Sequence, residues 1–370
     1  MRIGVPKEIK SQEYRVGLTP ESVSELVADG HELWVETQAG AGIGALDADY
    51  KKAGAAIKAS AAEIFAACEM IVKVKEPQAG ERAMLRPGQI LYTYLHLAPD
   101  PEQTKDLIKS GAVCIAYETV TDDSGQLPLL KPMSQVAGRL ATQVGATALQ
   151  KLGGGRGTLL GGVPGVGSGK VVIIGGGDVG YNAALIAIGM QADVTILERS
   201  NKVMEKLSYE FGNRAQVRRS TPDSLARLLA DADLVIGAVL IPGAAAPKLL
   251  TREMLSLMKE GSVLVDVAID QGGCFETSKP TTHADPTYIV DGVVHYCVAN
   301  MPGAVARTSA YALNAATLNY AKRIARLGWK EAMRADSHLL NGLNVCEGKL
   351  TYKAVADAQG LEWVEPASML

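Results

Sequence analysis

A glycine-rich turn constrains the fold of this chain more than any other feature of its sequence. The apolar run Lys170-Val-Val-Ile-Ile is typical of a strand, and the pattern G-x-G-x-x-G follows it directly at Gly175, Gly177 and Gly180. The first glycine permits a tight turn, the second lets the backbone approach a pyrophosphate, and the third lets the next helix pack closely on the strand. The pattern therefore predicts a strand-turn-helix unit that binds a dinucleotide.

Three further residues bear on which dinucleotide binds. Glu198 ends the next predicted strand, 23 residues after Gly175, which is close to the spacing of the acid that binds the ribose hydroxyls. Its carboxylate would repel a 2′-phosphate, so we expect NAD rather than NADP, although Arg199 beside it can accept such a phosphate. Asp178, inside the turn, suits an empty helix N-terminus but would repel a pyrophosphate unless its side chain points to solvent.

The chain length predicts two domains. A chain of 370 residues is longer than a single hydrophobic core usually supports, and ligands often bind in the cleft between two domains. Apolar runs alternate with helical patterns in both halves, which indicates an α/β fold with mostly parallel sheets. We predict two Rossmann-like doubly wound domains separated by a cleft. Residues 1–130 plus 308–370 would form the substrate-binding and catalytic domain, and 131–307 the NAD-binding domain, with a helix over 310–326 packing back on the first.

Three predicted strands of the first domain end in polar residues. They cover residues 70–75, 90–96 and 112–118, and Lys75 and His96 close the first two. Ligands of open α/β sheets bind at the carboxyl ends of the strands, so both side chains are candidates for a site by their position.

Helix-start signals occur at two places. Thr19 supplies an N-cap and Pro20 a first-turn proline for one helix. Ser134 is the expected cap of a second helix, which carries Val136 and Leu140 on one apolar stripe.

Composition and charge argue against several functional classes. The net charge is -3, from 37 basic and 40 acidic residues, so no large basic surface is available to bind nucleic acid or an anionic membrane. No apolar stretch approaches the length of a membrane span and the N-terminus lacks a secretory pattern, so we expect a cytoplasmic protein. The five cysteines and five histidines are scattered, which predicts buried reduced thiols and no metal site.

Eight short segments resemble the alanine dehydrogenase and pyridine nucleotide transhydrogenase family, and their order covers nearly the whole chain. They are Arg2-Ile-Gly-Val-Pro-Lys-Glu, Arg15-Val-Gly-Leu-Thr-Pro, Lys73-Val-Lys-Glu-Pro, Tyr94-Leu-His-Leu, Pro132-Met-Ser, Gly161-Gly-Val-Pro-Gly, Asp266-Val-Ala-Ile-Asp-Gln-Gly-Gly and Asn300-Met-Pro-Gly-Ala. Each is modest evidence alone, but the combination is specific to alanine dehydrogenase.

The resemblance implies a reaction and a set of roles. The reaction is the reversible oxidative deamination of L-alanine to pyruvate and ammonium with hydride transfer to NAD, and the family commonly forms homohexamers. Arg15 would grip the substrate carboxylate and Lys75 would contact the substrate oxygen. His96 would serve as acid and base, and Asp270 would assist the chemistry of water and ammonia.

The expected cofactor contacts combine the glycine-rich turn with positions that the resemblance implies. They are Ser134, Gly175, Gly177, Asp178, Val179, Gly180, Glu198, Ser220, Val239, Leu240, Ile269, Asn300 and Met301. The sequence departs from the family pattern at Asp178, where a small or apolar residue is usual, and at Glu198, where aspartate is usual. Both departures concern the fit of the cofactor rather than the chemistry.

The residues alone leave alternatives open. Arg15 could form a surface salt bridge, Lys73 could take the role of Lys75, and a lone histidine is more often structural than catalytic. Asp266, four residues before Asp270, is the better candidate for a structural carboxylate. The alternative functions are a soluble NAD-binding component of a transhydrogenase, a catalytically silent NAD sensor, and an enzyme acting on a larger amino acid.

Overall fold

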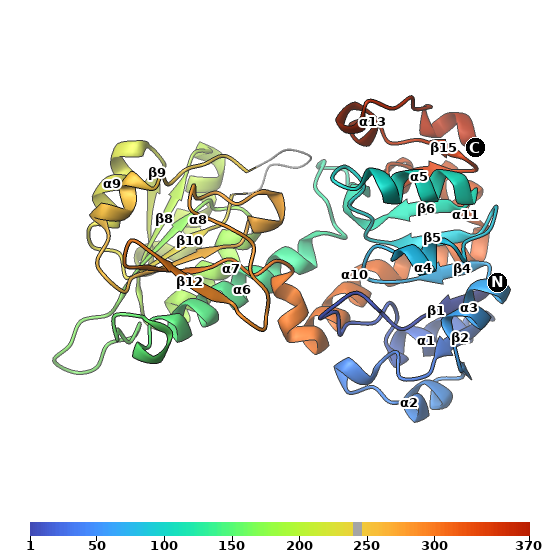
Figure 1. The fold of residues 1–370 in the computed structure, drawn as a ribbon, viewed down its shortest axis with the longest axis horizontal. Coiled ribbons are helices and arrows are strands. Elements are labelled where there is room, and N and C mark those ends of the chain that lie inside the picture. Colours follow the sequence, from blue (N-terminus) through green and yellow to red (C-terminus); the bar gives the residue numbers. More distant parts are fainter. Residues whose placement is uncertain (240–245) are drawn as a thin grey trace. The chain divides into compact units, whose positions relative to one another are not determined.

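The computed structural model describes residues 1–239 and 246–370, and the chain divides into two compact units (Figure 1). Unit 1 comprises Met1–Met133 and Val305–Leu370, and unit 2 comprises Ser134–Ala304. Each unit is built around a sheet of its own and is described separately.

Unit 1 contains an eight-stranded sheet in the order β15-β14-β6-β5-β4-β1-β2-β3. Strands β1 to β6 are parallel, whereas β14 and β15 extend one edge in antiparallel fashion. The strands are β1 (Arg2–Val5), β2 (Glu32–Glu36), β3 (Ala56–Lys58), β4 (Met70–Val72), β5 (Ile90–Thr93), β6 (Val113–Ala116), β14 (Leu343–Cys346) and β15 (Lys349–Leu350). Strands β4, β5 and β6 are buried along their whole length, as expected for parallel strands covered on both faces.

The helices of unit 1 connect these strands and cover the sheet. They are α1 (Pro20–Ala28), α2 (Asp47–Lys52), α3 (Ala61–Ala67), α4 (Ala79–Arg82), α5 (Pro101–Ser110), α10 (Ala306–Leu327), α11 (Trp329–Arg334), α12 (Ser337–Leu340) and α13 (Lys353–Gln359), with the 3-10 turns η1 (Ala41–Ile43), η2 (Tyr117–Thr119) and η8 (Pro366–Met369). Thr19 caps α1 and Pro20 is its first residue, as predicted. The long helix α10 packs on unit 1, also as predicted, because the Asn314 side chain accepts from the backbone N–H of Thr19 and donates to the carbonyl of Gly17.

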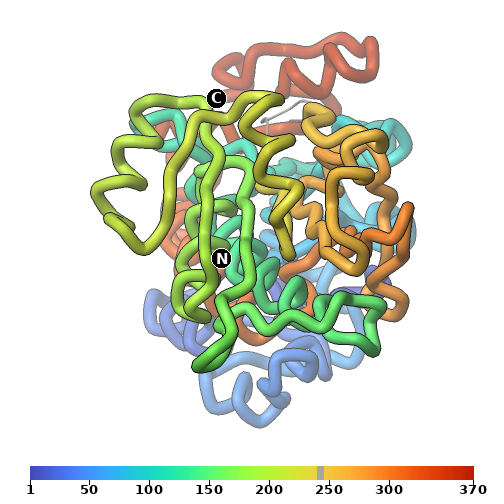
Figure 2. Tube along the Cα trace, turned by 90° about the vertical axis from the view of Figure 1, so that its left-hand side faces the viewer, coloured from blue at the N-terminus to red at the C-terminus, as the bar shows by residue number. Residues whose placement is uncertain are grey.

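Unit 2 contains a seven-stranded sheet in the order β12-β13-β11-β10-β7-β8-β9. Every neighbouring pair is parallel except β12 with β13. The strands are β7 (Lys170–Ile174), β8 (Asp193–Glu198), β9 (Gln216–Arg219), β10 (Leu234–Gly237), β11 (Val263–Asp266), β12 (Thr287–Val290) and β13 (Val293–Tyr296). The green to yellow-green trace in Figure 2 follows β7, β8 and β9.

Most helices of unit 2 cross over between parallel strands. The crossover helices are α7 (Asp178–Gly189), α8 (Asn201–Phe211) and α9 (Pro222–Leu229), whereas α6 (Lys131–Ala148) begins three residues inside unit 1 and precedes the first strand of the sheet. The 3-10 turns are η3 (Lys151–Gly153), η4 (Gly212–Arg214), η5 (Glu253–Leu257), η6 (Ile269–Gln271) and η7 (Met301–Val305), of which the last reaches the boundary of the unit.

The two sheets wind in the same way. In unit 1 the chain runs outward from β1 to β3 in one direction and from β4 to β6 in the other, and in unit 2 it does the same from β7 to β9 and from β10 to β13. This order is that of the Rossmann fold, so the prediction of two Rossmann-like doubly wound domains is confirmed. Ligands of such sheets bind where the winding reverses, at the carboxyl ends of β1 and β4 and of β7 and β10.

The prediction made three strands of unit 1 too long. They end at Val72, Thr93 and Ala116 rather than at residues 75, 96 and 118. Side-chain carboxylates accept backbone N–H groups beyond two of these ends, Glu8 beyond β4 and Glu118 beyond β5. The polar strand ends are therefore turns rather than ladder positions.

The prediction of Ser134 as a helix cap was wrong. Helix α6 begins at Lys131, so Ser134 lies inside its first turns. Pro132 explains the earlier start, because its fixed backbone angle and missing N–H suit the beginning of a helix.

The thiols agree with the prediction, because all five cysteines are free and buried. Burial raises the pKa of the Cys68 and Cys346 thiols to about 12, so neither is a thiolate at neutral pH.

Among the described residues, no helix has the length and the hydropathy needed to traverse a bilayer.

Candidate functional site

The glycine-rich turn follows β7 at the reversal point of the unit 2 sheet. Gly175 has φ +101°, and a Cβ there would lie 2.7 Å from the carbonyl oxygen of Ala238, which follows β10. A Cβ on Gly180 would lie 1.8 Å from the carbonyl oxygen of Gly175, whereas a Cβ on Gly177 would meet nothing within 4 Å. Gly175 and Gly180 thus lie against the protein backbone, where a side chain would not fit. Gly177 faces open space, which leaves room for a phosphate at the start of α7.

Glu198 is held in a fixed orientation beside this turn. Its Oε2 accepts the backbone N–H of Gly176 at 2.7 Å, and its Oε1 accepts those of Arg199 at 2.6 Å and Ser200 at 2.8 Å. A carboxylate has about four acceptor sites, two on each oxygen, and these three N–H groups occupy both sites of Oε1 and one of Oε2, so Oε2 can still accept one hydroxyl of a ribose. The remaining acceptor site of Glu198 therefore fits a hydroxyl of an adenosine ribose, whereas its negative charge disfavours a 2′-phosphate.

Asp178 is the first residue of α7 and is exposed. Its carbonyl oxygen accepts a hydrogen bond from the Asn182 side chain at 2.8 Å, within the same helix. A carboxylate in the first turn of a helix stabilises it through the helix dipole. Because Asp178 is exposed to solvent, its negative charge is compatible with a neighbouring pyrophosphate.

The structure brings several other predicted cofactor residues to the same edge of the sheet. Ser220 follows β9, and its N–H donates to the carbonyl of Glu198 at 2.8 Å. A Cβ on Gly175 would lie 3.0 Å from Cγ2 of Val239, the second residue after β10. Val179 is buried in the first turn of α7. Three further expected contacts thus lie around the glycine-rich turn.

The remaining predicted cofactor residues lie on other segments. Ile269 and Met301 are buried, and Asn300 has φ +59°. Ser134 is partly exposed on α6. Leu240 lies outside the described residues.

Asp270 and Asp266 have different environments. Asp266, at the end of β11, is fully buried, and its carboxylate accepts hydrogen bonds from the Cys274 N–H at 2.9 Å and the Ser278 hydroxyl at 2.5 Å. Asp270 is exposed, and its Oδ2 accepts from the Asn300 N–H at 3.4 Å. Asp266 is therefore the structural carboxylate, as expected, and Asp270 is the one accessible to a ligand.

Arg15 is buried rather than on the surface. Its side chain is 2% exposed and forms a bidentate pair with Glu13, with N–O distances of 2.7 and 2.6 Å, while its Nη1 lies 3.1 Å from Sδ of Met133. Burial disfavours the charge, but the Glu13 carboxylate outweighs this effect and raises the pKa of Arg15. The alternative of a surface salt bridge is therefore wrong, and the guanidinium is a permanently charged group in a fixed orientation.

The two candidate lysines after β4 differ in burial. The Lys73 side chain is fully buried between two carboxylates, with its Nζ 2.9 Å from Glu8 and 2.7 Å from Glu81. Lys75 keeps 12% of its side chain exposed, and its Nζ lies 4.0 Å from Oε2 of Glu76. Lys73 is thus buried and ion-paired in the interior of unit 1, so Lys75 is the better candidate for contact with a ligand.

His96 lies in a turn, three residues beyond the end of β5. Its backbone has φ +49°, and 43% of its side chain is exposed. The imidazole stacks on the Tyr94 ring with centroids 5.7 Å apart and planes 8° apart. An exposed ring held against a buried aromatic side chain is oriented and still accessible to solvent and substrate.

Sequence reasoning assigned no role to three carboxylates that organise this edge of unit 1. Glu13 pairs with Arg15, Glu8 accepts the backbone N–H of Val74 at 2.6 Å, and Glu118 accepts that of His96 at 2.6 Å. The available signal was their position, since Glu8 and Glu118 follow β1 and β6 as closely as the predicted residues follow β4 and β5.

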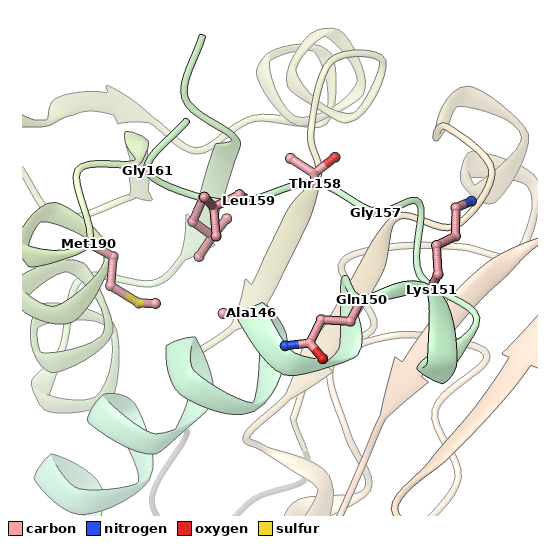
Figure 3. A pocket seen from close by; sticks show the side chains of 9 residues that line it. Ala146, Gln150, Lys151, Gly157, Thr158, Leu159, Gly161 and Met190 are labelled. Atoms are coloured by element: carbon pink, nitrogen blue, oxygen red, sulfur yellow. The ribbon is translucent and has the colours of Figure 1, made fainter. Parts of the chain in front are cut away.

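A surface pocket of about 550 Å³ lies elsewhere in unit 2 (Figure 3). It is lined by Ala146, Gln150, Lys151, Gly157, Thr158, Leu159, Leu160, Gly161 and Met190. Met190 follows the last residue of α7, so the pocket lies at the opposite end of this helix from Gly177. None of the described cofactor candidates lines it, and we assign it no part in nucleotide binding.

Family models cover most of the chain. The N-terminal domain of alanine dehydrogenase/PNT matches residues 4–137, and the C-terminal domain of alanine dehydrogenase/PNT matches residues 141–353.

Individual proteins resemble the chain over its full length. An alanine dehydrogenase from Halomonas elongata is 59% identical over 100% of both chains. A solved structure named L-alanine dehydrogenase superposes with a TM-score of 0.95 at 50% identity, over 97% of this chain and 99% of the other. A transhydrogenase from Sinorhizobium meliloti superposes with a TM-score of 0.85 at 25% identity, over 95% and 100%. The similarity to the alanine dehydrogenases is thus much greater than that to the transhydrogenase.

Proposed function

Because this chain belongs to the alanine dehydrogenase/PNT family, we propose that it is an NAD-dependent L-alanine dehydrogenase. The reaction converts L-alanine, water and NAD⁺ to pyruvate, ammonium, NADH and a proton, and it is reversible. The observation that carries the proposal is the set of polar groups beyond the strands of unit 1: a buried guanidinium at Arg15, an ammonium at Lys75 and an accessible imidazole at His96. An NAD sensor or a nucleotide-binding component has no need of this set.

We propose NAD as the cofactor because the turn after β7 fits it. Gly177 leaves space for the pyrophosphate at the N-terminus of α7, and Oε2 of Glu198 offers an acceptor to a ribose hydroxyl. NAD, when bound, accepts a hydride from Cα of alanine. The protein has to orient the amino acid, exclude competing reactions and move protons.

Arg15 and Lys75 would bind and orient the substrate. A guanidinium pairs bidentately with a carboxylate, which limits the rotation of alanine and selects the face of Cα that loses the hydride. Glu13 holds Arg15 in place before substrate binds, so less conformational entropy is lost on binding. Lys75 would donate to the oxygen that becomes the pyruvate carbonyl and would stabilise its developing negative charge.

His96 and Asp270 would move protons after the amine has been oxidised to an iminium. His96 would take a proton from the attacking water and return it to the nitrogen as the carbinolamine collapses to pyruvate and ammonia. Asp270 would bind the ammonium that leaves or polarise the water that attacks. Both residues leave the hydride transfer itself to the cofactor.

An assay with the purified protein tests the proposal. NAD and a panel of small L-amino acids would be followed at the absorbance of reduced nicotinamide, with L-alanine expected to react best. Tight NADH binding without any oxidation of alanine would indicate a sensor. Hydride exchange between NADH and an oxidised NADP analogue, without oxidation of alanine, would indicate a transhydrogenase component.

Glu198→Gln should raise the Michaelis constant for NAD by about tenfold and that for NADP by much less, because the lost interaction is a hydrogen bond from a ribose hydroxyl to a charged acceptor. The two constants would be measured at saturating alanine. Equal changes in both would remove Glu198 from the ribose site and leave the choice of NAD without support.

A matched pair of alanine substitutions tests the glycine-rich turn. Gly180→Ala should destabilise unit 2 by about 1–3 kcal/mol, because its Cβ would overlap the Gly175 carbonyl oxygen. Gly177→Ala should fold normally, since its Cβ meets open space and its φ of -68° suits alanine, but should weaken NADH binding. Thermal unfolding and fluorescence titration with NADH measure the two effects. Unchanged NADH affinity in Gly177→Ala would place the phosphates elsewhere.

We further propose that the enzyme acts in the cytoplasm as a homo-oligomer, a hexamer by family resemblance, without nucleic acid or membrane partners. The net charge of -3 and the five free buried thiols support this setting. Light scattering after size-exclusion chromatography would give the number of subunits.

A further inference from the structure

A carboxylate from another part of unit 1 binds the backbone of the turn that carries His96. Glu118 lies in η2, directly after β6, and 15% of its side chain is exposed. Its Oε1 accepts the backbone N–H groups of Leu95 at 3.0 Å and His96 at 2.6 Å, and its Oε2 also lies 3.2 Å from the Leu95 nitrogen. One side chain therefore holds two consecutive N–H groups just beyond the end of β5.

These bonds maintain an unfavourable backbone conformation. His96 has φ +49°, the left-handed region that residues other than glycine rarely adopt. Such a residue persists only where its surroundings hold it, and positions of this kind are common at functional sites. The strong charge-assisted bond to Glu118 acts directly on the His96 backbone.

The same carboxylate also lies beside the imidazole. Glu118 Oε1 is 4.0 Å from Nδ1 of His96, while Tyr94 stacks on the face of the ring and anchors its own hydroxyl on the Leu129 carbonyl at 2.6 Å. Tyr94 thus packs on the face of the imidazole ring, and Glu118 fixes the backbone of His96. This arrangement sets the direction in which the second ring nitrogen, Nε2, is presented.

We propose that Glu118 is the positioning residue of His96: it orients the imidazole for proton transfer and does not itself bind alanine or NAD. The inference rests on the proposed function, in which His96 exchanges protons with water and the carbinolamine. Its chemical consequence is specific. Losing Glu118 should slow the steps that follow hydride transfer and leave the binding of alanine and of NADH intact.

The test is the Glu118→Gln variant, which keeps the size of the side chain and removes its charge and one acceptor. We expect kcat for alanine oxidation to fall about 10- to 100-fold, which is part of the 10²- to 10⁴-fold contribution of a general acid-base. The Michaelis constant for alanine and the dissociation constant for NADH should change less than twofold. The deuterium isotope effect on kcat with alanine deuterated at Cα should shrink toward unity, because proton transfer rather than hydride transfer would limit the rate.

Two results would overturn the proposal. One is a kcat within twofold of the wild type. The other is a larger isotope effect together with a raised Michaelis constant for alanine, which would place Glu118 in substrate alignment. Should Glu118→Gln fail to fold, Glu118→Asp keeps the charge but draws the carboxylate back from the turn, and the same loss confined to kcat is expected there.

A matched control separates positioning from a general loss of stability. Asp336 is also 15% exposed and accepts two consecutive N–H groups, of His338 at 3.0 Å and Leu339 at 3.1 Å, but these belong to helix α12. Asp336→Asn should leave kcat and the isotope effect unchanged. If wild-type protein itself does not oxidise alanine, the proposed function fails; if it does so and Glu118→Gln behaves like Asp336→Asn, only the role of Glu118 fails.

Discussion

His96→Ala and Asp270→Asn should each abolish measurable oxidation of alanine while NADH binds almost normally. The expected loss of kcat is on the order of 10²- to 10⁴-fold for each, because each variant removes a group that moves or stabilises a proton in the transition state. Both side chains are accessible, so their loss disturbs little of the packing. Asp270 keeps its size as asparagine, and the bond that it accepts from the Asn300 N–H is long at 3.4 Å.

Steady-state rates in both directions and NADH fluorescence titrations would measure these effects. Asp266→Asn is the informative comparison for Asp270, since Asp266 is buried and bonded to the protein. It should lower the melting temperature, whereas Asp270→Asn should lower kcat. Retained activity in His96→Ala or in Asp270→Asn would remove that residue from the mechanism.

The nucleotide-binding part of the fold could be predicted closely because its signals are local. Strand β7 occupies Lys170–Ile174 as expected, and the glycine-rich turn and Glu198 are found together beside it. Each glycine there is required by a short-range contact, such as that of Gly180 with Gly175. A pattern of a few residues therefore contains the information that shapes this turn.

The substrate side could be predicted only in part, because its organisation depends on residues far apart in sequence. Glu8 lies 65 residues before Lys73, and Glu118 lies 22 residues after His96. No periodicity links such residues, so the sequence could not show that β4 and β5 end early or that Lys73 is buried. Likewise Glu13 and Arg15 lie in a loop, where their spacing does not reveal that they pair in the interior.

The short edge strands were missed for a related reason. Strands β12 to β15 have two to four residues each and lie at or next to the edges of the two sheets, where β12 with β13, β14 with β15 and β14 with β6 pair in antiparallel fashion. A run of this length is too short to show alternation, and its pairing depends on the sheet that it joins. Their absence from the prediction did not affect the candidate sites, which lie at the central strands.

Lys73→Met should destabilise unit 1 by about 3–5 kcal/mol, the largest stability effect that we expect from a single substitution in this chain. The Lys73 ammonium is fully buried between Glu8 and Glu81, whose side chains are each 2% exposed. Methionine fills a similar volume but leaves two buried carboxylates without a cation. Thermal unfolding should show a fall in melting temperature on the order of 10 °C.

The loss in free energy of unfolding caused by Lys73→Met should grow as the pH rises. Burial raises the pKa of Glu8 above its ordinary 4.5, and the neighbouring ammonium of Lys73 opposes that rise. Between pH 4.5 and the pKa of Glu8 in the folded state, Glu8 keeps a proton that the unfolded chain has released. The free energy of unfolding therefore falls as the pH rises through this range. Removing the ammonium moves the upper limit of this range to higher pH. The variant should therefore lie closer to the wild type near pH 5 than near pH 8.

Denaturant unfolding at several pH values would measure this trend. Lys353→Met is the matched control, because Lys353 pairs with Asp357 on the surface, where both side chains are about 60% exposed. Exposed pairs contribute little to stability, so this control should differ little from the wild type at any pH. If the loss in free energy of unfolding caused by Lys73→Met is small, or stays constant from pH 5 to pH 8, water or another cation reaches the carboxylates of Glu8 and Glu81. The contrast between Lys73 and Lys75 would then lose its physical basis, and Lys73 would return as a candidate for the substrate oxygen.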